Sequence, residues 1–172
     1  MRLWAVSGRC LVSLVCLVGG GCGGSDAPST PSPQPMPAPA PPPINGVFGG
    51  GGSAMSSLGT EARASASIEI TNNVITNLSM PWRIGAPAGT PQATFCAGSA
   101  SITNLNLTPD TNSFSRDIDS VQYLTHVEGT VAGDTLRGAL MLTAHAGSVP
   151  AYCANATIPW TAAKGQSPTP LQ

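Results

Sequence analysis

Apolar residues recur at every second position over much of the chain, and the clearest example is the segment 121–146. A two-residue turn at Gly133-Asp134, of the type that takes glycine first, joins the two halves of this segment. The resulting register places Val127 opposite Leu140 on an apolar face and directs His126 to a largely polar face. Because a one-residue slip would mix the two sets, the pattern predicts a β-hairpin in this register.

The pair Asn72-Asn73 marks a second hairpin, since asparagine tolerates the left-handed backbone that tight turns need. A three-residue loop over residues 71–73 would pair Ile70 with Val74. A two-residue loop would instead pair Ile70 with Ile75. The sequence leaves both pairings open.

Signals for helices are nearly absent, and the remaining segments give softer predictions. Residues 82–92, which contain two prolines, are expected to form a loop, and Gly49–Gly52 a hinge or a bulge. Further strands are expected over residues 44–49, 94–105 and 152–162.

Two cysteines of this β-rich region, Cys96 and Cys153, are expected to form a disulfide in an oxidising compartment. Strands that simply alternate in direction would place the two cysteines at opposite ends of a sheet, too far apart for a bridge. One extra strand near residues 113–117 would bring the two cysteines to the same end of the sheet. The prediction is therefore an all-β antiparallel meander of eight strands, closed as a small barrel with its first and last strands paired, or flattened into a sandwich.

The N-terminus has the three parts of a secretory signal peptide. Arg2 and Arg9 give a positive start, residues 10–18 form a short apolar run, and small residues then lead to Cys22. The run is about half of the roughly 20 residues that a membrane-spanning helix needs. The segment 18–22, Val-Gly-Gly-Gly-Cys, resembles the lipobox of bacterial lipoprotein precursors, with Gly19 where that family usually has leucine.

The resemblance implies that residues 1–21 are removed as a signal peptide and that Cys22 receives lipid. Two or three acyl chains on one residue anchor a protein stably to a membrane. No aspartate follows Cys22 directly, and by the same resemblance this favours the outer membrane of a bacterial cell envelope. The resemblance covers the leader alone.

Proline-rich sequence separates this leader from the predicted barrel. Nine prolines lie within residues 27–43, so residues 22–43 are expected to form a disordered, extended tether that carries the lipid at its start. The barrel domain is expected over residues 44–165. Residues 166–172 are expected to form a disordered tail.

The charge of the mature chain excludes one class of partner. From Cys22 onward, five basic and eight acidic residues give a formal charge of 5 − 8 = −3, with no basic cluster. Nucleic-acid binding therefore has no electrostatic basis. The sequence predicts no cofactor.

A metal or acid–base site has weak support in the sequence. His126 and Glu128 share one face of the predicted hairpin, but His145 lies about 13 Å from His126 at about 3.3 Å per residue. The two histidines cannot share one tetrahedral zinc ion, so no metal site is predicted. Asp117 and Asp119 are interpreted as solvated loop acids.

The sequence contains no recognised catalytic arrangement, so the chain is predicted not to be an enzyme. The favoured function is a lipid-anchored envelope protein whose β-domain binds a protein, a glycan or a small apolar ligand. A purely structural lipoprotein without a pocket is the alternative, and a hydrolase is the least favoured. A ligand cavity would be lined by Tyr123, Val127, Leu140 and Trp160.

Overall fold

A computed structural model describes residues 40–171, apart from residues 57, 88 and 90–94. The signal peptide, the lipobox with Cys22 and most of the tether lie outside the described residues. The barrel domain falls within one compact unit that spans Ala40–Gln172. No helix in the described ranges is long and apolar enough to cross a membrane.

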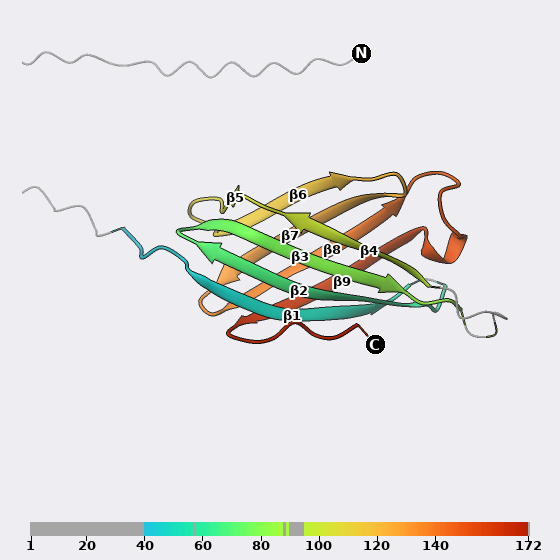
Figure 1. Cartoon of the computed structure of the whole chain (residues 1–172), viewed down its shortest axis with the longest axis horizontal. Helices are drawn as coiled ribbons and strands as arrows, with labels where there is room; N and C mark the ends of the chain where they lie inside the picture. The colour runs from blue at the N-terminus through green and yellow to red at the C-terminus, as the bar shows by residue number, and fades with distance from the viewer. Residues whose placement is uncertain (1–39, 57, 88, 90–94, 172) are drawn as a thin grey trace, which may run out of the picture. The chain divides into compact units, whose positions relative to one another are not determined.

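The described residues form an all-β domain with a single short 3-10 helix, η1 (Ala151–Cys153), as Figure 1 shows. The strands in chain order are β1 (Gly46–Met55), β2 (Glu61–Thr71), β3 (Val74–Ile84), β4 (Cys96–Ile102), β5 (Leu105–Asn106), β6 (Ser113–Asp119), β7 (Tyr123–Ala132), β8 (Thr135–Ala144) and β9 (Asn155–Lys164).

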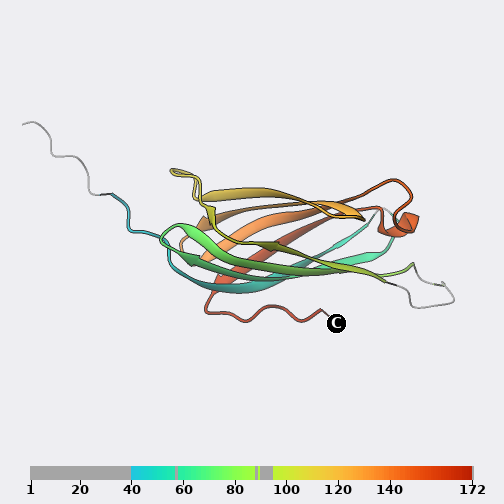
Figure 2. The same cartoon turned by 45° about the horizontal axis from the view of Figure 1, so that its top comes forward.

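Eight of the strands form one antiparallel sheet in the order β4-β3-β2-β1-β9-β8-β7-β6, and the two-residue β5 pairs with the start of β3. The first strand pairs with the last, as predicted, through the contacts between β1 and β9. Figures 1 and 2 show the sheet curling so that β1–β4 face β6–β9. The sheet is nearly closed into a barrel, and its two free edges are β4 and β6. The predicted fold class and the extra strand before β7 are confirmed.

The hairpin β7–β8 has the predicted register. Val127 lies opposite Leu140, and the two-residue turn contains Gly133 with a positive φ of 60°. The apolar side chains of this register, among them Leu140 and Leu142, are buried.

The hairpin β2–β3 combines a two-residue turn with a register shift. Asn72 and Asn73 have φ values of 52° and 63°, and Ile70 pairs with Ile75. The pairing shifts between Glu69 and Ile70, so that Ile68 lies opposite Leu78. The two-residue alternative is correct at the turn, and the bulge keeps the apolar positions of both strands facing the core.

The run Gly49–Gly52 belongs to β1, and its prediction as a hinge or bulge was wrong. This run pairs continuously with β2 and, over most of its length, with β9. A Cβ on Gly50 would overlap the Thr161 carbonyl oxygen, and one on Gly52 would overlap that of Pro159. The glycines are therefore needed because β1 crosses β9 too closely for side chains at the seam between the first and the last strand.

The opening between β4 and β6 has a physical reason in the sequence of β6. Arg116 occupies an inward-facing register position on this strand, between Phe114 and Ile118 and opposite the buried Val127. Arg116 remains exposed, because β6 lies at the edge of the sheet. A charge that points inward on an edge strand discourages pairing with a further strand.

The C-terminal segment that the sequence predicts as a disordered tail lies against the barrel. After Gly165 the chain turns back and runs along the outer face of β1, beside Gly49 and Gly51. The backbone N–H of Thr169 donates a hydrogen bond of 2.8 Å to the Gly50 carbonyl. The tail thus covers the seam formed by β1 and β9.

Candidate interaction surface

The two ends of the barrel differ in construction. Residue 44 enters the barrel at one end, which also holds the tight turns 72–73 and 133–134. The opposite end is called here the distal end. It carries the connections that follow each strand whose direction is away from residue 44. The described residues of these connections are 56, 58–60, 85–87, 89, 95, 120–122 and 145–154.

The distal end carries most of the exposed large apolar side chains of the described residues. Val121 is 93% exposed in the connection between β6 and β7. Met55, Leu58 and Phe95 are also more than half exposed, at 67%, 56% and 53%. Soluble proteins scatter single exposed apolar residues widely, but their concentration at one end of a domain is typical of an interaction surface.

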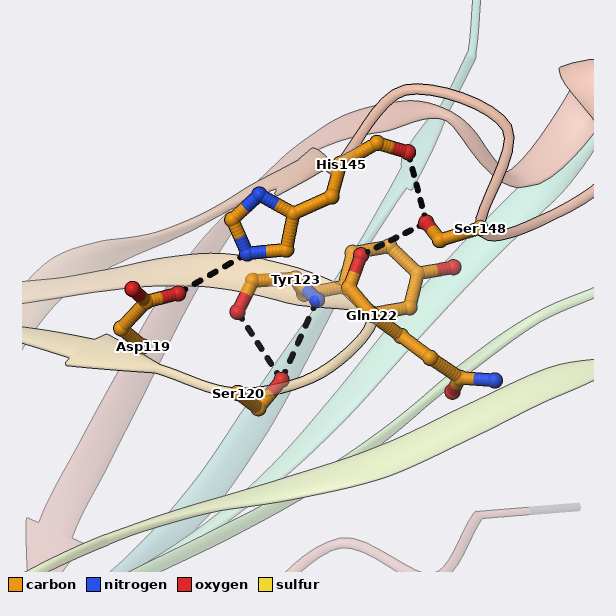
Figure 3. A network of polar contacts seen from close by, with 6 residues as sticks. All are labelled: Asp119, Ser120, Gln122, Tyr123, His145 and Ser148. Atoms are coloured by element: carbon orange, nitrogen blue, oxygen red, sulfur yellow. Dashed lines mark hydrogen bonds and ion pairs between the residues drawn. The ribbon is translucent and has the colours of Figure 1, made fainter.

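The turn that carries Val121 is held by hydrogen bonds, as Figure 3 shows. The Ser120 hydroxyl donates to the Tyr123 carbonyl at 2.9 Å and accepts from the Tyr123 N–H at 3.1 Å. The Ser148 hydroxyl lies 3.0 Å from the Gln122 carbonyl and 2.7 Å from the His145 carbonyl. Val121 is therefore displayed on a fixed turn.

The connection 56–60 is fixed in the same way. The Ser56 hydroxyl accepts hydrogen bonds from the backbone N–H groups of Leu58 and Thr60, each at 3.2 Å. Phe95 is held by a cation–π contact, since the Arg83 guanidinium lies 4.2 Å from the centre of its ring. These apolar side chains are thus presented by ordered structure.

The predicted disulfide joins two elements at the distal end. The Cα atoms of Cys96 and Cys153 are 6.2 Å apart, and the bridge is formed. Cys153 lies in η1, within the connection 145–154, and not at the start of the following strand. Because this connection reaches over the end of the barrel, β4 and the region before β9 meet without being neighbours in the sheet.

Tyr123 connects this region to the core. Its hydroxyl donates a hydrogen bond of 3.0 Å to the Cys153 carbonyl, and its ring packs edge-on against Trp82 at 4.9 Å. Burial raises the pKa of the Tyr123 phenol, and the charge of the nearby Tyr152 raises this pKa further. A neutral tyrosine at this position ties η1 to the barrel interior.

Asp117 and Asp119 lie on β6 next to the two histidines, so their interpretation as loop acids was wrong. Asp117 Oδ1 is 2.5 Å from His126 Nδ1, and Asp119 Oδ1 is 2.8 Å from His145 Nε2. Glu128 approaches the other ring nitrogen of His126 at 3.6 Å. The carboxylates of Asp117 and Glu128 therefore lie at opposite sides of one imidazole. The described residues contain no group of three histidine, cysteine or acidic side chains placed so that they could hold a metal ion.

The four residues of the predicted cavity lie in the core. Tyr123, Val127, Leu140 and Trp160 are all nearly fully buried. The Trp160 indole packs against two glycines, since a Cβ on Gly138 would lie 2.5 Å from its Cζ2 atom. Its Nε1–H group is buried and has no hydrogen-bond partner among the described residues. The grooves described here have other linings, and a cavity at these residues stays a prediction.

A polar groove runs over β6, β7 and β8 and meets the cluster around His126 at Glu128. Its volume is about 570 Å³. The lining residues are Thr108, Ser113, Phe114, Ser115, Glu128, Gly129, Thr130, Arg137 and Gly138.

Sequence reasoning missed the distal end as a site. Leu58 gave the one signal, as a large apolar residue outside the predicted strands, whereas Phe95 and Val121 fell within the predicted strands 94–105 and 121–146. Only the strand order shows that their connections share one end of the barrel.

Comparison of the chain with protein-family models, with curated proteins and with solved structures finds no match.

Proposed function

We propose that this chain is a lipid-anchored lipoprotein of the bacterial envelope whose barrel is a non-catalytic binding module. Its membrane contact is the lipid on Cys22, in the outer membrane, and its recognition surface is the distal end. The lipobox resemblance supports the anchor. The observation that carries the binding function is the set of exposed apolar side chains on hydrogen-bonded connections at that end.

The chemistry of the distal end favours a protein as the partner. Apolar side chains that are held in fixed positions lose little conformational entropy on binding, and they form the centres of many protein interfaces. Val121 is the best candidate for such a centre, because it projects from a turn that the hydroxyl groups of Ser120 and Ser148 hold by hydrogen bonds. Residue 44, the first residue of the predicted domain, lies at the opposite end of the barrel.

A glycan is a second candidate, and the polar groove over β6–β8 favours it. Hydroxyl groups of serine and threonine line this groove together with Glu128 and Arg137. Such a set can donate and accept hydrogen bonds with sugar hydroxyls. A small apolar ligand between Tyr123 and Trp160, a structural role without a ligand, and hydrolysis are the remaining alternatives.

The arrangement of side chains gives no support to hydrolysis. A hydrolase with an Asp–His pair needs a nucleophile within reach of the imidazole. Of the two serines drawn in Figure 3, Ser120 directs its hydroxyl to the Tyr123 carbonyl. Ser148 directs its hydroxyl to the carbonyls of Gln122 and His145. We therefore propose binding without catalysis.

Site-specific photocrosslinking in intact cells tests the binding surface. A benzophenone amino acid is placed at Val121 at the distal end or, as the matched control, at Asp134 at the opposite end. We expect a discrete crosslinked product from position 121 alone, and a weaker one when Leu58→Ser and Phe95→Ser are added. Equal products from both positions, or none from position 121, would contradict the proposal.

A further inference from the structure

The outer face of β1 forms a shallow trough in which the C-terminal tail lies. A Cβ on Gly49 would overlap the Gln166 carbonyl oxygen and approach Ser167. One on Gly51 would overlap the Ala64 carbonyl oxygen of β2 first and would lie 3.0 Å from the Thr169 Cβ. The absence of a side chain at Gly49 above all therefore permits a second segment of chain to lie against β1. The contact is specific as well as close, because Thr169 N–H donates to the Gly50 carbonyl at 2.8 Å.

The trough is wider than the tail that occupies it. A groove of about 280 Å³ separates the tail from the side formed by β8 and β9. A second groove of about 260 Å³ lies on the side formed by β2, where Glu61 and Arg63 form an ion pair at 2.8 Å. The tail is mostly exposed to solvent between these grooves. The trough can therefore release the tail and accept another segment without rearrangement of the barrel.

The sequence of the tail indicates which segments fit. Pro168 and Pro170 flank Thr169, the residue whose N–H bonds to the trough. Proline has no N–H group to leave unsatisfied and favours an extended backbone before binding. A segment that alternates proline with a hydroxyl-bearing residue thus provides one backbone N–H donor at the required place. Its extended backbone also lowers the entropy cost of binding.

We propose that the glycine trough of β1 is a binding site for extended peptides that alternate serine or threonine with proline, and that the chain's own tail closes this site. The site lies on the outer face of β1, away from the distal connections, and does not depend on the proposed function. A covalently attached occupant has an effective concentration in the millimolar range. An external peptide therefore binds well only when the tail is displaced or removed.

The direct test compares the full chain with a chain that ends at Gly165 and so keeps the Gly165 N–H bond to Val47. The probe is a fluorescent peptide with the sequence of residues 166–172, and binding is measured by fluorescence anisotropy. We expect saturable binding to the shortened chain and at least about ten-fold weaker binding to the full chain, because the attached tail competes. A peptide with Thr169→Pro lacks the donor and should not bind.

A matched pair of variants locates the binding. The three atoms nearest to a Cβ on Gly49 all belong to the tail, whereas those nearest to a Cβ on Gly50 belong to β9. In the shortened chain, Gly49→Ala should abolish peptide binding and leave the melting temperature unchanged. Gly50→Ala should lower the melting temperature.

The proposal is overturned if the shortened chain is folded and does not bind the peptide, or if Gly49→Ala binds it equally well. Should the shortened chain unfold, hydrogen exchange of the full chain decides. We then expect protection of the Thr169 amide in the parent chain and its loss in Gly49→Ala. An unprotected Thr169 amide in the parent chain would also overturn the proposal.

Discussion

At the scale of single residues, Tyr123 connects more parts of this domain than its position at the start of β7 suggests. Its ring packs against Trp82 from β3, and its hydroxyl bonds to the carbonyl of Cys153 in η1. Removing the hydroxyl leaves a buried carbonyl without this partner. Tyr123→Phe should therefore cost about 1 kcal/mol of the free energy of unfolding at neutral pH, measured by urea denaturation.

The same residue predicts a loss of stability at alkaline pH. Because the pKa of Tyr123 is raised in the folded state, chiefly by burial, the unfolded chain releases the phenol proton first, at a pH of about 10. The unfolded state then binds fewer protons, so the free energy of unfolding falls as the pH rises above this value. Urea denaturation between pH 8 and pH 11 should show a shallower fall in Tyr123→Phe. An identical fall in both proteins would contradict the assignment.

Core and surface positions of the β7–β8 hairpin should differ sharply in their contribution to stability. Leu140 is fully buried, and Leu140→Ala should cost about 2–5 kcal/mol. His126 is partly exposed, and its contacts with Asp117 and Glu128 lie on the outer face. Surface ion pairs contribute little, so His126→Ala should change the free energy of unfolding by less than about 1 kcal/mol. Comparable losses in both variants would show that the assignment of faces is inverted.

The sequence predicted which face of the sheet each of these side chains occupies, but it did not predict which other side chains they contact. Alternation along one hairpin determines that Leu140 points inward and His126 outward, because the side-chain period of a strand is two. The contact of His126 with Asp117 depends on the register of β6 against β7. That register joins segments separated by a connection whose geometry the sequence did not reveal.

At the scale of elements, β1 shows how backbone packing determines composition. Gly50 and Gly52 lie where β1 crosses β9, and a side chain at either position would overlap a carbonyl of β9. Gly50→Ala should destabilise the barrel by about 1–3 kcal/mol, as other overpacked sites do. Urea denaturation of the full chain measures this loss. A variant as stable as the parent chain would show that the seam is not tightly packed.

The disulfide links β4 to η1 across a sequence separation of 57 residues. Closing a loop of this size restricts the unfolded chain, so the double substitution Cys96→Ser and Cys153→Ser should cost about 4 kcal/mol. Mass spectrometry of a non-reduced digest of protein from cells should contain the linked peptide. Two cysteines that react freely with an alkylating reagent would contradict the bridge.

The local turns of this fold could be predicted from the sequence. Contacts between segments far apart in the chain could be predicted only in part. The turns at Asn72-Asn73 and Gly133-Asp134 are encoded by residues that tolerate a left-handed backbone. The disulfide requirement also led to the additional strand β6, which is a long-range inference. The glycines of β1 were misread, because the atoms that Gly49, Gly50 and Gly52 make room for lie in β9 and the tail, more than 100 residues further along the chain.

At the scale of the whole molecule, the barrel has one end that receives the tether and another that carries the exposed apolar side chains. The antiparallel order of the strands produces this separation, since alternate connections fall at opposite ends. The distal end could not be recognised from sequence because its apolar residues come from separate connections. In the proposed function, the tether is attached at the near end, and the distal end is the surface proposed for a partner.

The central claim is that Cys22 anchors this barrel to the envelope through lipid, and metabolic labelling with a radioactive fatty acid tests it most directly. Cells that produce the full chain should yield a labelled protein in the membrane fraction, and the Cys22→Ala variant should carry no label. Cys10→Ala is the matched control and should be labelled like the parent chain, because Cys10 lies within the leader that is removed. An unlabelled parent chain, or a Cys22→Ala variant that still incorporates the fatty acid, would contradict the account.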